Sequence, residues 1–133
     1  MTVTDALQAW LALEHEAVWF YPVVGARRSN LVDRATTSFT THRDVRDSLL
    51  GRLRRLGVDP VMADLTYAVG PLATATDARK AARSLEARIS AACLRLTGEA
   101  EDELRTYAVK GLTRAALAEQ TWGAKPRAFP GLP

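Results

Sequence analysis

Apolar residues recur at the spacing of an α-helix in four separate segments of the sequence, and this pattern limits the possible folds more than any other feature. The stretches between them do not alternate between apolar and polar residues as a half-buried strand does. The spacing predicts helices over residues 4–28, 30–56, 76–97 and 99–122. We therefore expect an all-α fold, formed as one domain over residues 1–133 with a C-terminal tail over residues 123–133.

Local signals mark the first helix. Thr2 or Thr4 is the expected cap, and Asp5 lies in the first turn, where a carboxylate interacts favourably with the helix dipole. Pro22 should kink this helix or break it locally.

Similar signals mark the other helices. Ser29 or Asn30 is the expected cap of the second helix, and Gly57 and Gly98 are expected to end the second and third helices. Glu119 falls on the inward face of the fourth helix.

The lengths of the connections predict how these helices are arranged. Only a few residues separate the first helix from the second and the third from the fourth, so each pair should form an antiparallel hairpin. The middle connection, from Gly57 to Ala75, could extend to roughly 60 Å, whereas a helix over residues 30–56 is about 40 Å long. This connection can cross the whole bundle and make the second and third helices parallel, or it can fold back as a loop.

A carboxylate interrupts the apolar stripe of the first helix. Leu7, Leu11, Glu14, Val18 and Tyr21 fall on one helical face, so Glu14 lies where a core residue is expected. An isolated buried carboxylate costs several kcal/mol, so Glu14 must be protonated, paired with a base or bound to a cation. The candidate bases are His42, Arg46, Lys110 and Arg114.

Two further polar residues are expected in the same layer as Glu14. His42 lies near the middle of the second helix, and Glu86 near the middle of the third. One interpretation is a hydrogen-bonded, charge-paired layer without further function. A second is one divalent ion held by Glu14, His42 and Glu86, and a third is a small-molecule pocket with Tyr21, Trp19 or Tyr107 nearby.

Four stretches of the sequence together resemble a bacterial ferritin-like domain family of unknown function. They are LEHEAVWFYPVVGAR, THRDVRDSLLGRL, LEARISAAC and the ending AFPGLP. The resemblance implies a ferritin-like four-helix bundle and matches Glu14, Glu86 and His42 to ligands of a di-iron site. Phe39 stands where the second helix needs a glutamate, and the fourth helix lacks both Glu and His at that layer. We therefore expect a degenerate di-iron site and a non-catalytic role in assembly or partner binding, with a mononuclear metal or redox protein as the alternative.

Composition and the remaining motifs limit the possible partners. A net charge of only +3, with acidic and basic residues interleaved, argues against nucleic acid, and no apolar run is long enough for a membrane span. We find no catalytic constellation and expect no cofactor, with iron, manganese or zinc as the possible ions. The lone Cys93 reads as a buried thiol of a cytoplasmic protein. We expect a homodimer through the first helix, or a protein partner bound through Trp19 and Phe20 or through Phe129 and Leu132 of the tail. Phe129 and Leu132 are alternatively expected as apolar anchors that pack the tail back onto its own bundle.

Overall fold

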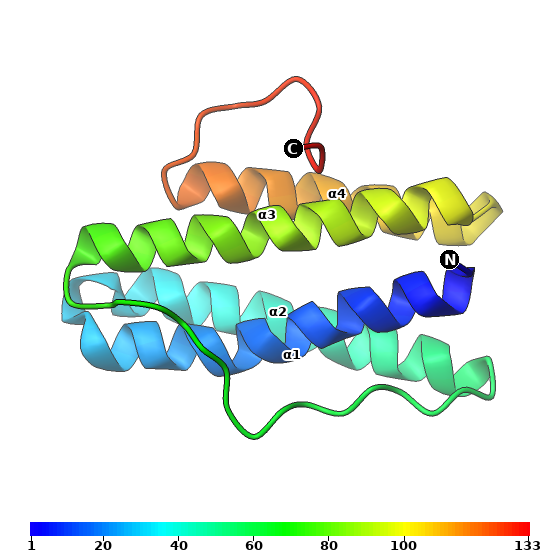
Figure 1. The fold of residues 1–133 in the computed structure, drawn as a ribbon, viewed down its shortest axis with the longest axis horizontal. Helices are drawn as coiled ribbons and strands as arrows, with labels where there is room; N and C mark the ends of the chain where they lie inside the picture. Colours follow the sequence, from blue (N-terminus) through cyan, green and yellow to red (C-terminus); the bar gives the residue numbers. More distant parts are fainter.

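A computed structural model describes residues 1–133, and its regular structure is entirely helical. This confirms the predicted all-α fold with four α-helices and no strand. The elements are α1 (Val3–Arg27), a short 3₁₀ turn η1 (Ser29–Leu31), α2 (Val32–Arg55), α3 (Ala75–Glu99) and α4 (Asp102–Thr121). All four helices lie roughly along one axis, as an α1–α2 pair beside an α3–α4 pair (Figure 1).

Side-chain caps begin two of the four helices. The Thr2 hydroxyl accepts a hydrogen bond from the Asp5 backbone N–H at 3.1 Å, and the Asp5 carboxylate accepts one in return from the Thr2 N–H, which forms a capping box. The Thr74 hydroxyl likewise accepts from the Asp77 N–H at the start of α3. Of the two caps that the sequence allowed for α1, Thr2 and Thr4, the structure uses Thr2, and Asp5 is the predicted acidic residue of the first turn.

Three predicted boundaries or breaks differ from the structure. α1 continues without a break through Pro22. Gly98 does not end α3, because it lacks the positive φ of a left-handed cap and the helix runs on to Glu99. Residues 29–31 form η1 instead of a simple side-chain cap for α2. Gly57, in contrast, follows α2 with φ +73°, as expected of a stop residue.

One continuous apolar core joins the helices, but the four do not pack equally. α1 packs against α2 and α3, and α3 packs against α4, whereas α2 and α4 have no extensive contact. The bundle is therefore closed on the α1–α3 side and less tightly closed between α2 and α4. No helix is both long enough and apolar enough to cross a membrane.

The linker between α2 and α3, residues 56–74, runs along the outside of the bundle from the end of α2 to the opposite end, where α3 begins (Figure 1). Gln8 binds the backbone of Asp59 and Val61 with both its amide atoms, each at 2.8 Å, and a ring nitrogen of His15 lies 2.9 Å from the Val61 carbonyl. These contacts fix the linker on α1.

The aromatic run of α1 is used within the chain rather than left as an open face. Trp19 packs against Tyr67 of the linker, with ring centroids 5.9 Å apart, and Phe20 is only 3% exposed. The expected aromatic surface for a partner is therefore not present at Phe20. Neighbouring residues of a helix point to different faces. Phe20 therefore faces the core, and Trp19 packs against the linker instead.

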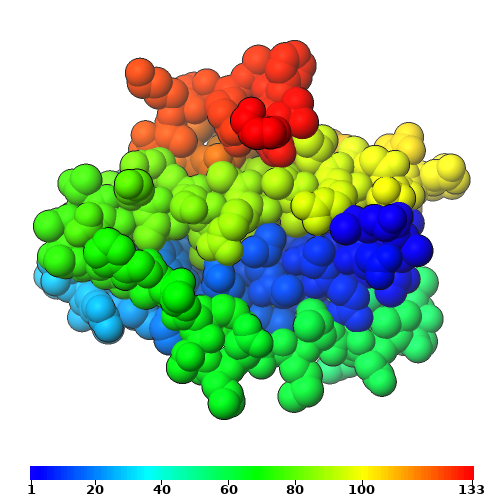
Figure 2. Space-filling view, viewed as in Figure 1, coloured from blue at the N-terminus to red at the C-terminus, as the bar shows by residue number.

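The tail, residues 123–133, folds back over α3 and α4 (Figures 1 and 2). Arg127 holds it by an ion pair to Glu119 of α4 at 3.2 Å, and Gly131 lies so close to Leu94 of α3 that a Cβ there would meet it at 2.9 Å. Phe129 and Leu132, expected as the apolar anchors, are 72% and 50% exposed. A charged contact and a glycine contact therefore hold the tail on the bundle.

Candidate functional site: a buried carboxylate and imidazole layer

The structure brings Glu14, His42 and Glu86 together at the centre of the bundle, and we call these three residues the polar layer. Nδ1 of His42 lies 2.6 Å from Oε2 of Glu14, and Nε2 lies 2.6 Å from Oε1 of Glu86. All three side chains are buried, with Glu86 fully so. His42 of α2 thus links α1 to α3, because one ring nitrogen contacts Glu14 of α1 and the other contacts Glu86 of α3.

This geometry sets the protonation state of His42. An ionised carboxylate only accepts hydrogen bonds, so a ring between two ionised carboxylates donates from both nitrogens, as only the imidazolium can. Burial by itself lowers the pKa of His42, but the charge of Glu14 and the hydrogen bonds to Glu14 and Glu86 outweigh it and raise the pKa from 6.5 to about 10. The layer therefore contains a buried cation at neutral pH.

Two aromatic donors complete the polar layer. The indole Nε1 of Trp10 donates to Oε1 of Glu14 at 2.9 Å, and the hydroxyl of Tyr21 donates to Oε1 of Glu86 at 2.6 Å. Burial, followed by the charge of Glu86, raises the pKa of Tyr21 well above its usual range, so the phenol keeps its proton. The Tyr21 ring also stacks on His42, with centroids 5.4 Å apart and planes 8° apart.

Sequence reasoning found the layer but did not assign these donors. Trp10 lies four residues before Glu14, and this spacing places the two on one helical face and could have identified the pair. Of the candidate bases, only His42 contacts Glu14. Arg46 pairs with Asp47 near the surface, and Lys110 is exposed.

The polar layer as arranged here does not fit a single metal ion. The types of donor suit iron, manganese or zinc. However, the two carboxylates lie at opposite edges of the His42 ring, so Glu14, His42 and Glu86 do not converge on one point. No group of three His, Cys, Asp or Glu side chains in the chain has an arrangement that could hold an ion.

A second buried polar cluster lies on the face between α3 and the tail. The Ser90 hydroxyl donates to Oε2 of Glu119 at 3.0 Å, and Arg127 of the tail donates to the same carboxylate. Glu119 is 7% exposed and Ser90 is fully buried. Sequence reasoning placed Glu119 on the inward face of the fourth helix but gave no reason to expect Ser90 as its partner.

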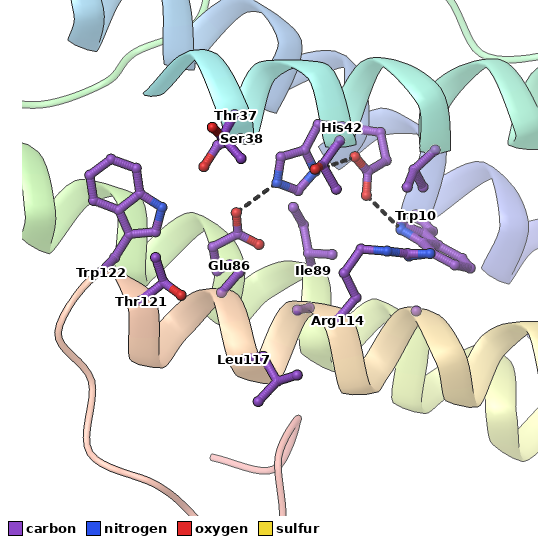
Figure 3. Close-up of a pocket in the computed structure, with 16 residues that line it drawn as sticks. Trp10, Thr37, Ser38, His42, Glu86, Ile89, Arg114, Leu117, Thr121 and Trp122 are labelled. Carbon is purple, nitrogen blue, oxygen red and sulfur yellow. Dashed lines mark hydrogen bonds and ion pairs between the residues drawn. The ribbon is translucent and has the colours of Figure 1, made fainter. Parts of the chain in front are cut away.

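A cavity of about 230 Å³ opens beside the polar layer where α2 and α4 separate, and we call it the α2–α4 cavity. Glu14, His42 and Glu86 form part of its wall, and Trp10 and Trp122 contribute aromatic surface (Figure 3). The other polar residues that line it are Thr37, Ser38 and Thr41 of α2 and Arg114 and Thr121 of α4. The polar layer therefore borders this cavity.

Fold and site together define a helical-bundle protein with a charge-bridged polar layer beside a cavity. The chain belongs to a family described as a domain of unknown function (DUF4439), which matches residues 6–133. Its structure is similar to the crystal structure of a conserved hypothetical protein, rv2844, from Mycobacterium tuberculosis, with a TM-score of 0.84 and 26% sequence identity, covering 90% of this chain and 93% of that one. A comparison with curated proteins found no match.

Proposed function

We propose that this chain is a non-catalytic, ferritin-like bundle protein in which the polar layer is a degenerate di-iron site. The course of the linker along the bundle, which makes α2 and α3 parallel in Figure 1, supports the ferritin-like topology. A single apolar core shared by the helices supports one domain over residues 1–133. A cytoplasmic location belongs to the same proposal and is supported by Cys93, a buried free thiol.

The observation that carries the proposal is the double engagement of His42. A metal-binding histidine offers the lone pair of one nitrogen, but here both nitrogens point at carboxylate oxygens 2.6 Å away. The remaining ligand positions of a di-iron site also lack donors. Phe39 lies on α2 beneath the guanidinium of Arg43, and α4 presents Gly111 and Ala115 to the cavity at this level.

Metal analysis tests this proposal against a mononuclear metal or redox protein that uses Glu14, His42 and Glu86. The protein is purified without chelator, incubated anaerobically with iron, manganese or zinc, desalted and analysed by mass spectrometry. We expect no stoichiometric ion in the natural chain or in Glu14→Gln. Glu16→Gln is the control, because Glu16 lies on the same helix but pairs with Arg88 at the surface. One ion per chain that is lost in Glu14→Gln and kept in Glu16→Gln would establish the metal-binding alternative.

The role in assembly or partner binding rests on the exposed tail. We propose a homodimer in which Phe129 and Leu132 supply apolar contacts, because the tail is fixed by Arg127 while these two side chains face outward. Light scattering after size-exclusion chromatography of the natural chain should give the mass of a dimer, and the double variant Phe129→Ser, Leu132→Ser should give that of a monomer. A monomeric natural chain would leave the tail without a role in self-association.

A further inference from the structure

We propose that the α2–α4 cavity binds a small aromatic hydroxy acid, with its hydroxyl group beside Glu86 and Trp122 and its carboxylate beside Arg114. This inference does not depend on the origin of the polar layer as a metal site. It rests on two buried polar atoms without partners, on an unpaired cation at the same cavity and on the size and character of the wall.

The first observation concerns the part of the cavity lined by Glu86 and Trp122, which we call the deep end because both side chains are fully buried. Oε2 of Glu86 and Nε1 of Trp122 are both buried, belong to fully buried side chains and have no hydrogen-bond partner. Both residues line the cavity, and Trp122 turns its indole nitrogen toward the middle of it (Figure 3). One atom is an acceptor and the other a donor, so a ligand hydroxyl, which donates and accepts, can pair with either of them.

The second observation is the charge of Arg114. This exposed α4 residue makes no ion pair or side-chain hydrogen bond within the chain, and its guanidinium extends across the cavity toward Trp10 (Figure 3). A guanidinium binds a carboxylate in a bidentate manner. A carboxylate at the deep end would instead meet Glu86, so the charged end of the ligand belongs at Arg114 and the neutral hydroxyl belongs at the deep end.

The third observation is the space between these two ends. Trp10, Trp122, Ile89 and Val45 give the wall its apolar and aromatic character. The volume of about 230 Å³ exceeds the roughly 150 Å³ of a protein cavity that accommodates benzene. A benzene ring with one substituent at each end therefore matches the cavity in both volume and chemistry.

The test is a titration of the full chain with 4-hydroxyphenylacetate, followed by the fluorescence of the cavity tryptophans and by calorimetry. We expect saturable one-to-one binding. Phenylacetate lacks the hydroxyl and 4-methylphenol lacks the carboxylate, so each should bind about tenfold more weakly, as the loss of a hydrogen bond to a charged group predicts. Absence of saturable binding of 4-hydroxyphenylacetate, or equal affinity for all three compounds, would overturn the proposal.

Variants locate the binding. Arg114→Gln should weaken binding of 4-hydroxyphenylacetate about tenfold and leave 4-methylphenol unchanged, because only the former has a carboxylate to pair. Arg54→Gln, at an exposed position outside the cavity lining, is the matched control and should leave both affinities unchanged. Arg114 is exposed and forms no ion pair or side-chain hydrogen bond, so Arg114→Gln should fold, and an unchanged affinity in it would refute the assigned orientation.

Discussion

The raised pKa of His42 predicts that the protein loses stability as the solution becomes more basic. His42 has a pKa of about 10 in the folded chain and an ordinary value of 6.5, so the folded state holds its proton more tightly than the unfolded state. The stabilisation is fully present below about pH 6.5 and is lost as the pH rises through about 10. The prediction can therefore be tested by changing only the pH and following the stability of the natural chain.

The size of the effect follows from the same two values. A change of one in pKa corresponds to about 1.4 kcal/mol, so the complete loss is on the order of 5 kcal/mol. Between about pH 6.5 and about pH 8.5 the free energy of unfolding should fall by about 2 kcal/mol. Cys93 and Tyr21 contribute little in this window, because their raised pKa values start from ordinary values of 9.0 and 10.0.

Urea denaturation followed by circular dichroism, at several pH values in this window, measures the free energy of unfolding directly. His42→Gln should remove the pH dependence. His15→Gln is the matched control, because His15 lies on the outside of α1 against the linker carbonyl of Val61 and should leave the slope unchanged. If His42→Gln does not fold, NMR titration of the natural chain gives the same information, since the His42 ring should stay protonated beyond pH 8.

Two results would refute this reasoning. The first is a free energy of unfolding that stays constant between about pH 6.5 and 8.5, because that would mean His42 binds its proton no more tightly in the folded state. The second is an NMR midpoint for His42 near its ordinary value of 6.5. Either result would show that the two carboxylates do not hold an imidazolium between them.

Three further outcomes follow from contacts outside the polar layer. Gly111→Ala should destabilise the chain by about 1–3 kcal/mol in urea denaturation, because the new Cβ would overlap the ring of Trp10, whereas Gly98→Ala, with open space around it, should not destabilise. Burial raises the pKa of the Cys93 thiol, so native protein should react with a thiol reagent only as fast as it unfolds. Arg127→Gln should speed amide hydrogen exchange in the tail while leaving the midpoint of urea unfolding nearly unchanged, since the ion pair that it removes is partly exposed.

The fold could be predicted because each helix carries its own signals. Apolar spacing and the Thr2 cap are local properties, and each persisted in the structure. The layer could be predicted for a related reason, because Glu14, His42 and Glu86 lie near the middle of helices of similar length. A bundle of four helices of similar length along one axis brings such positions to one level whatever the direction of each helix.

What could not be predicted depends on distances between helices. Whether one or both ring nitrogens of His42 bond to a carboxylate depends on how closely α1, α2 and α3 approach one another. The spacing of residues in the sequence does not contain that information. Trp19 is covered because a linker of irregular backbone happens to pass over it. The tail is held through Arg127 and Gly131 rather than through its large apolar residues, and no periodic pattern marks such contacts.

If the polar layer is a degenerate di-iron site, as proposed above, the lack of further metal ligands and the presence of the cavity have a common cause in α4. At the level of the polar layer this helix presents Gly111, Ala115 and Ala118, which are too small to span the gap to α2. In the proposed ferritin-like ancestor, glutamate and histidine at this level would have filled that gap and held iron. In that proposal, their replacement by small residues would remove the ligands and leave the space, while His42 bonds to the two carboxylates that remain. A chain that lost its metal in this way would gain a pocket with Glu86 and Arg114 in its wall, so ligand binding is the property that the proposal makes worth testing.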